Sequence, residues 1–140
     1  MTASPTDTTQ QLARIDIFSG LSERQLKRLQ SRAKEVHHDA GRNITTEGNY
    51  ALDFHLILDG EVAVSQGGQV RRRLGPGDYF GEISMIDGRR RSATITTETP
   101  VRALAVSHAT FEELLDQDPS FARGLLKVLC ARLREAENAG

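Results

Sequence analysis

The middle of the chain, from about residue 33 to residue 106, consists of short apolar runs separated by turn signals. The runs are rich in β-branched side chains and lie between clusters of Gly, Pro, Asn and Asp. This pattern is typical of an antiparallel β-sandwich or β-roll. Asp59-Gly60 stands between two of the runs and predicts a β-hairpin. The predicted strands are residues 33–37, 43–46, 53–58, 61–65, 70–74, 92–97 and 101–106.

The two ends of the chain have helical periodicity instead. Residues 10–17 favour a short helix, and Ser22 begins another that extends to about residue 32, with Gln25 as its capping-box partner. Ser107 can cap a further helix, and Thr110 with Glu113 offers a second capping box. Asp118-Pro119 then begins a long helix. Its apolar positions recur every three or four residues: Phe121, Leu125, Val128, Leu129 and Leu133.

These elements predict an α+β fold that is mainly β. We expect an antiparallel β-roll or jelly-roll sandwich, flanked by an N-terminal helix and two C-terminal helices. Residues 1–9 are small and polar, which favours a mobile tail. Residues 10–140 are expected to form a single domain, since a chain of this length suits one modest core. We expect no attached effector domain.

Composition narrows the function classes. The formal net charge of −1 gives no general attraction to nucleic acid or anionic lipid. The single cysteine excludes an internal disulfide and a multi-cysteine zinc site. The N-terminus lacks a secretory pattern, and no apolar run has the ~20 residues that span a bilayer. We therefore expect a cytoplasmic protein that binds neither nucleic acid nor membrane.

One stretch, LGPGDYFGEISMIDGRRRSATI at residues 74–95, carries the candidate chemistry. Gly81 has no Cβ, so the backbone there can approach a ligand closely. Backbone amides from Glu82 onward would lack internal acceptors at the start of a helical turn and suit an anion. The Glu82 carboxylate suits a sugar hydroxyl, and the planar guanidinium of Arg91 fits two phosphate oxygens. Together these residues suit a small ligand that carries both hydroxyls and a phosphate.

The segment FGEISMIDGRRRSATI resembles the phosphate-binding cassette of cyclic nucleotide-binding domains, the β-roll of the catabolite activator and of protein kinase A regulatory subunits. Residues 52–64, LDFHLILDGEVAV, resemble the strand pair ahead of that cassette, and the likeness covers about residues 18–133. Arg90 stands where the family often has proline. The resemblance implies a short helix in the cassette and a ligand site made of Phe80, Gly81, Glu82, Ile83, Ser84, Arg91, Ser92 and Ala93.

The resemblance further implies that the long C-terminal helix closes over the base or pairs with its twin, with Leu129 and Leu133 as possible lid residues. Ala136 and Glu137 stand where the catabolite activator type has a base-contacting Thr-Ser pair, so no base contact carries over. We therefore expect only modest selectivity between cAMP and cGMP. The bound nucleotide is the ligand, and no cofactor or metal is implied. A homodimer and a separate effector protein are the expected partners.

Several charged or reactive residues have simpler interpretations. Arg89 and Arg90 are expected to face water. The run Arg71-Arg72-Arg73 is interpreted as part of a solvated strand and not as a binding patch, because alternation splits its side chains between two faces. His55 is interpreted as an ordinary strand residue. Cys130 is expected to be a small core or interface side chain.

The leading functional hypothesis is a non-enzymatic sensor for cAMP or cGMP. One alternative is an interaction domain that keeps the fold without the ligand; the set of Gly81, Glu82, Arg91 and Ala93 argues against it. The other is a cupin-type metalloenzyme, which would need histidines and a carboxylate clustered on neighbouring strands. The sequence has no H-x-H spacing, which makes this alternative remote.

Overall fold

The computed structural model describes residues 10–49, 53–81, 87 and 89–139. The chain divides into two compact units. One consists of residues 32–112, and the other combines residues 1–31 with residues 113–140. Each unit is described by itself below.

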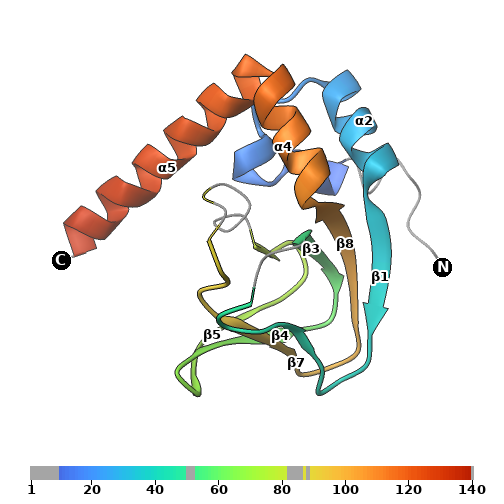
Figure 1. Ribbon diagram of the computed structural model, residues 1–140, viewed down its shortest axis with the longest axis vertical. Coiled ribbons are helices and arrows are strands. Elements are labelled where there is room, and N and C mark those ends of the chain that lie inside the picture. Colours follow the sequence, from blue (N-terminus) through green and yellow to red (C-terminus); the bar gives the residue numbers. More distant parts are fainter. Residues whose placement is uncertain (1–9, 50–52, 82–86, 88, 140) are drawn as a thin grey trace. The chain divides into compact units, whose positions relative to one another are not determined.

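The unit of residues 32–112 contains two four-stranded antiparallel sheets, which confirms the predicted β-roll (Figure 1). The first sheet has the order β1 (Lys34–His38), β8 (Val101–Ser107), β3 (Asp53–Asp59) and β6 (Tyr79–Phe80). The second has the order β2 (Asn43–Thr45), β7 (Thr94–Thr97), β4 (Val62–Gln66) and β5 (Gln69–Leu74).

The core of this unit lies between the inner faces of the two sheets. Alternation along β4 and β7 points Val62, Val64 and Ile95 inward, where they meet Ile57 and Phe80 from the other sheet. At one end of the roll, the ring of Phe54 packs on Phe111 with ring centroids 6.4 Å apart. Burial of this apolar surface is the main source of stability for the roll.

The hairpin predicted at Asp59-Gly60 is wrong. β3 ends at Asp59 and belongs to the first sheet, whereas β4 begins at Val62 and belongs to the second, so this turn carries the chain between sheets. The short hairpin of the roll joins β4 to β5 through Gly67 and Gly68, whose φ values are +57° and +80°. Two consecutive positive φ values are what a two-residue type I′ turn requires.

The predicted strand boundaries differ from the observed ones in two places. The strand expected from residue 92 starts at Thr94, because Ser92 and Ala93 form a bend. The two-residue strand β6 was not predicted, since Tyr79 and Phe80 follow a Gly-Pro-Gly-Asp turn and are too few to show alternation. All other predicted strands agree with the structure to within one residue at each end.

Two of the helices begin directly after a serine that caps them. In α2 (Glu23–Arg32) the predicted capping box is confirmed, because the Gln25 N–H donates to Ser22 Oγ and the Ser22 N–H donates to Gln25 Oε1. Ser107 caps α4 (His108–Gln117) by accepting from the Thr110 N–H, so the expected Thr110–Glu113 box is wrong.

The unit of residues 1–31 and 113–140 is built around α5 (Pro119–Ala139), whose first turn is capped by Asp118. Residues 10–13 are helical and are followed by η1 (Asp16–Phe18), so the single short helix expected over residues 10–17 is broken. The ring of Phe121 stacks on Phe18 with centroids 5.8 Å apart. The described helices include none that is both long and apolar enough to cross a membrane.

The apolar stripe of α5 is only partly buried. Phe121 and Leu125 are 1% and 3% exposed, whereas Leu126 and Leu133 are each 62% exposed. Cys130 is also exposed, so of the two expected places the core is wrong and an interface stays a prediction. The second half of α5 therefore presents apolar side chains at its surface.

The inter-sheet turn provides a test of the fold. Gly60 has φ of +92°, and an added Cβ would clash with the Pro100 carbonyl oxygen and lie 3.0 Å from Val101 Cα. Gly60→Ala should therefore lower the free energy of unfolding by about 2 kcal/mol or more, in part because the left-handed conformation alone costs ~1–2 kcal/mol. Urea denaturation measures the loss.

Two other glycines separate the causes. Gly41 has φ of +80° but open space around it, so Gly41→Ala should cost only the conformational part. Gly75 has open space and no positive φ, so Gly75→Ala should be nearly neutral. Equal losses for Gly60→Ala and Gly41→Ala would contradict the proposed clash at the inter-sheet turn.

Candidate ligand-binding site

The site is built around a glycine that follows directly after β6. Gly81 has φ of +95°, and a Cβ added there would lie 2.5 Å from Nη1 of Arg91 and 2.9 Å from the carbonyl oxygen of Asp53. Any other residue would displace the guanidinium from this position. The close approach that the sequence predicted at Gly81 is therefore made, in the ligand-free protein, by the side chain of Arg91.

Arg91 is held at both its backbone and its side chain. Its N–H donates to the carbonyl of Asn49 at 2.7 Å, and its carbonyl accepts from the N–H of Gly48 at 2.9 Å. Its guanidinium donates from Nη2 to the carbonyl of Asp53. The side chain is only 8% exposed, which is unusual for an arginine. Backbone groups of the β2–β3 loop and of the first residue of β3 thus fix the position of one cationic group.

The guanidinium lies in the wall of a pocket with a volume of about 400 Å³. Two histidines, His38 and His55, line it together with Asp53. The Nε2 of His38 and the Nδ1 of His55 are buried and have no hydrogen-bond partner among the described residues. The pocket therefore combines a fixed positive charge with a carboxyl group and two buried ring nitrogens. Its remaining lining residues are Val36, Asn43, Ile44, Thr45, Thr46 and Asn49.

His55 is the most strongly perturbed group in the pocket. Burial first, and then the positive charge of Arg91 and the neighbouring His38, together lower its pKa to about 4. Its ring stacks on Phe80 with centroids 5.0 Å apart. Burial also raises the pKa of Asp53, although Arg91 opposes that rise. At neutral pH the imidazole beside Arg91 is therefore uncharged.

The structure places the other predicted site residues as follows. Phe80 is buried in the core of the roll and touches His55. Ser92 is exposed, and its carbonyl accepts from Gln66 Nε2 at 3.0 Å. Ala93 is half-buried and packs against the core. Glu82, Ile83 and Ser84, like the predicted cassette helix, lie outside the described residues. Leu129 is half-buried and Leu133 is exposed, both on α5.

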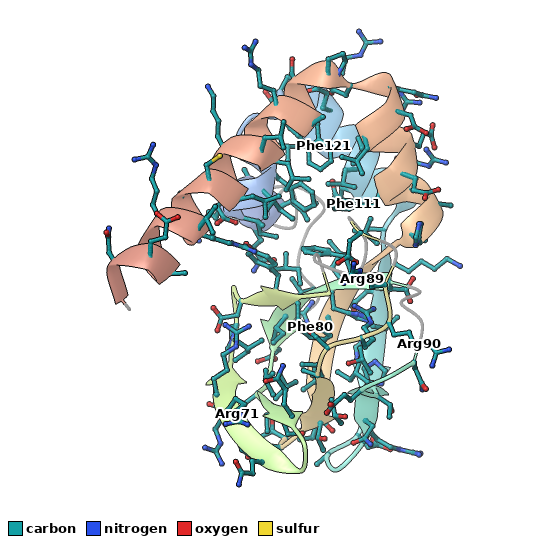
Figure 2. The ribbon with its side chains drawn as sticks, turned by 60° about the vertical axis from the view of Figure 1, so that its left-hand side comes forward. Arg71, Phe80, Arg89, Arg90, Phe111 and Phe121 are labelled. Carbon is teal, nitrogen blue, oxygen red and sulfur yellow. The ribbon has the colours of Figure 1, made fainter. Side chains whose placement is uncertain are left out.

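Arg89 and Arg90 are exposed, as predicted (Figure 2). Figure 2 labels Arg90 at the edge of the roll and Phe80 within it. A larger depression of about 630 Å³ is lined by His37, Arg42 and Asp59 among others, but it contains none of the predicted site residues. The pocket that holds Arg91 is therefore the better candidate.

One residue of this site was not singled out from the sequence. His55 was taken as an ordinary strand residue, although it is buried against Phe80. The run Arg71-Arg72-Arg73 was placed in a solvated strand, and all of β5 up to Arg73 is indeed exposed. The register pairs Arg72 with Val64, whose side chain belongs to the core. Counting back from the Gly67-Gly68 turn would have paired Val64 with Arg71 instead, because the register shifts between Val64 and Ser65.

Comparison with known families identifies the family to which this chain belongs. The family described as the cyclic nucleotide-binding domain matches residues 35–118, which is more than half of the chain. The chain belongs to the cyclic nucleotide-binding domain family. This is a regulatory, ligand-binding family, and the matched region contains both Gly81 and Arg91.

Individual relatives share the domain at moderate identity. The chain is 30% identical over 132 residues to a CRP-like cAMP-activated global transcriptional regulator of Mycobacterium tuberculosis, covering 91% of this chain and 59% of that protein. It is 39% identical over 84 residues to a cGMP-dependent protein kinase of Eimeria tenella, covering 60% of this chain and 8% of the kinase. The chain thus matches less than two thirds of the length of each of these two relatives.

A solved structure of similar extent has the same fold. It is the N-terminal domain of a transcriptional regulator from Streptomyces coelicolor, with a TM-score of 0.77 and 29% identity. The match covers 93% of this chain and 94% of that one. The likeness of fold therefore extends over almost the whole of this chain.

The buried imidazole makes stability depend on pH. The pKa of His55 is about 4 when folded and 6.5 ordinarily, so between these values only the unfolded chain binds the proton. The contribution of His55 is complete above pH 6.5 and is lost as the pH falls toward 4, by up to about 3 kcal/mol. His55→Phe should flatten this part of the stability profile, measured by urea denaturation at each pH.

The exposed His37 provides the control, since His37→Phe should leave the slope as it is in the wild type. The raised pKa of Asp53 has the opposite sign and is present in all three proteins, so it cancels in the comparison. An unchanged slope in His55→Phe would contradict a neutral, buried imidazole.

Proposed function

We propose that this chain is a sensor module that binds cAMP or cGMP, with the cyclic phosphate on Arg91. The observation that carries the proposal is a buried arginine guanidinium against the positive-φ Gly81, in a chain of the cyclic nucleotide-binding domain family. The mycobacterial relative is named as cAMP-activated and the Eimeria relative as cGMP-dependent, so both nucleotides are candidates.

The chemistry of the pocket supports an anionic ligand. A guanidinium has five donor hydrogens, so the bond to the Asp53 carbonyl orients its plane without using all of them. Two parallel N–H donors match two oxygens of a phosphate. The neutral His55 adds no competing charge. By the resemblance of the cassette, Glu82 would accept from the ribose hydroxyl, and the amides of Glu82, Ile83, Ser84 and Ala93 would surround the phosphate.

Replacement of the buried arginine tests this function directly. Loss of one partner of a desolvated, hydrogen-bonded charge pair costs ~2–5 kcal/mol. Arg91→Ala should therefore weaken binding of cAMP or cGMP by roughly thirty-fold to several thousand-fold, measured by calorimetry. Arg91→Lys should restore only part of the affinity, because an ammonium cannot form the bidentate fork. Linear nucleoside monophosphates should bind more weakly than the cyclic ones.

The exposed Arg89 is the matched control, because a screened surface charge contributes little. Circular dichroism verifies that each variant is folded, which matters because Arg91 is buried. If Arg89→Ala lowers affinity more than Arg91→Ala does, the assignment of the phosphate contact is wrong. If the folded wild-type protein binds neither cyclic nucleotide, the proposed function itself is refuted.

We also propose that a second copy of this chain covers the exposed half of α5. Leu126 and Leu133 are seven residues apart, so they lie on the same face of the helix, and each is 62% exposed. An isologous pair of such helices would bury both positions. A variant carrying Leu126→Glu and Leu133→Glu should be monomeric by light scattering while the wild type is dimeric. A monomeric wild type, with and without nucleotide, would contradict the proposal.

A further inference from the structure

The pocket that contains Arg91 is lined mainly by elements outside the predicted cassette. Of the described residues predicted to bind the nucleotide, namely Phe80, Gly81, Arg91, Ser92 and Ala93, only Arg91 lines it. The other lining residues belong to β1, β2, the loop after β2, and β3. β1 and β2 are edge strands of their sheets, whereas β6, which leads into the cassette, is the opposite edge of the first sheet. Arg91 therefore has a second polar neighbourhood beside β1 and β2.

Two histidines line this neighbourhood with ring nitrogens that lack partners. Val36 of β1 packs against the core, so His38, two residues along the strand, faces the inside of the roll. Ile57 places His55 on the inner face of β3 in the same way. Nε2 of His38 and Nδ1 of His55 are buried, and neither has a hydrogen-bond partner among the described residues. Since buried polar atoms are nearly always hydrogen-bonded, two such nitrogens in one pocket point to a bound polar group.

The charges around the pocket favour an anion as that group. The guanidinium of Arg91 is 8% exposed, and its bond to the Asp53 carbonyl uses one of five donor hydrogens. The side chain of Asp53 is the acidic group of the described lining. Burial raises the pKa of Asp53, while Arg91 and Lys34 act in the opposite direction. Two positive groups thus act on one carboxyl group whose charged form burial disfavours.

We propose that this pocket binds a small molecule through a phosphate or carboxylate group held by Arg91, His38 and His55. The guanidinium would supply the positive charge, and the unpartnered nitrogen of each imidazole would donate a hydrogen bond in the matching tautomer. Thr46 and Asn49 are further polar residues of the lining. A volume of about 400 Å³ lies within the range of small-molecule sites in proteins. The site goes beyond the proposed function, because it shares only Arg91 with the predicted cassette among the described residues.

One consequence rests on the proposed function. A cyclic nucleotide and the oxyanion would both use the guanidinium of Arg91, and their negative charges would repel each other. The oxyanion should therefore weaken nucleotide binding, and by linkage the nucleotide should weaken oxyanion binding by the same factor. The pocket would then give the sensor module a second small-molecule input.

Titration of the full chain with inorganic phosphate and with acetate, without nucleotide, tests the site. In NMR spectra of the imidazole nitrogens, the signals of His38 and His55 should shift in a saturable manner, while those of His37 and His108 stay in place. The oxyanion that binds more tightly indicates whether the natural group is a phosphate or a carboxylate. His55→Phe keeps a ring that can stack on Phe80 but removes the donor. It should weaken binding of this oxyanion roughly tenfold or more, as expected for a lost hydrogen bond to a charged group.

His37→Phe is the matched control, because it removes an exposed imidazole of β1 that lies beside Glu35. It should leave the oxyanion affinity unchanged. Unshifted signals of His38 and His55 would overturn the inference and indicate that water pairs with their nitrogens. Equal phosphate affinity in the wild type and folded His55→Phe would also overturn it, since the phosphate would then lie in the cassette. A wild type that binds phosphate in the pocket but no cyclic nucleotide would refute the proposed function and support this site.

Discussion

The burial of the Arg91 guanidinium is the interaction on which the candidate site depends. An arginine cannot lose its proton in a protein, so it keeps its full charge when it is taken out of water. Here a backbone carbonyl, that of Asp53, accepts from it, and Gly81 leaves room for it. The carbonyl dipole offsets part of the cost of burial. In the proposed function the same guanidinium binds a cyclic phosphate, whose oxygens match its parallel donors.

The surroundings of Arg91 follow from the two-sheet construction. The loop that joins β2 of the second sheet to β3 of the first contains Gly48 and Asn49, and Arg91 lies just before β7 of the second sheet. The Gly48 N–H donates to the Arg91 carbonyl and the Arg91 N–H donates to the Asn49 carbonyl, which joins these two segments. His55 of β3 packs on Phe80 of β6 and stays neutral, because burial disfavours its charged form and the guanidinium would repel a second positive charge. Placement of the charge and packing of the core are thus coupled.

Local patterns in the sequence predicted what depends on local physics. Most of the strands and the Ser22–Gln25 capping box could be predicted, because alternation and capping act over a few residues. Pairing between sheets could not. Asp59-Gly60 has the composition of a hairpin turn, yet Gly60 connects two sheets because the partner of β3 is the distant β8. The burial of His55 and the face of Arg72 depend on the same long-range register.

The division between phosphate and base follows from what each residue can distinguish. Both cyclic nucleotides carry the same phosphate, so a contact through Arg91 contributes affinity without selectivity. Specificity is a difference of two affinities and requires a group that meets the part in which the ligands differ. Any preference for one base must therefore come from residues other than Arg91, and it can change without disturbing the buried guanidinium.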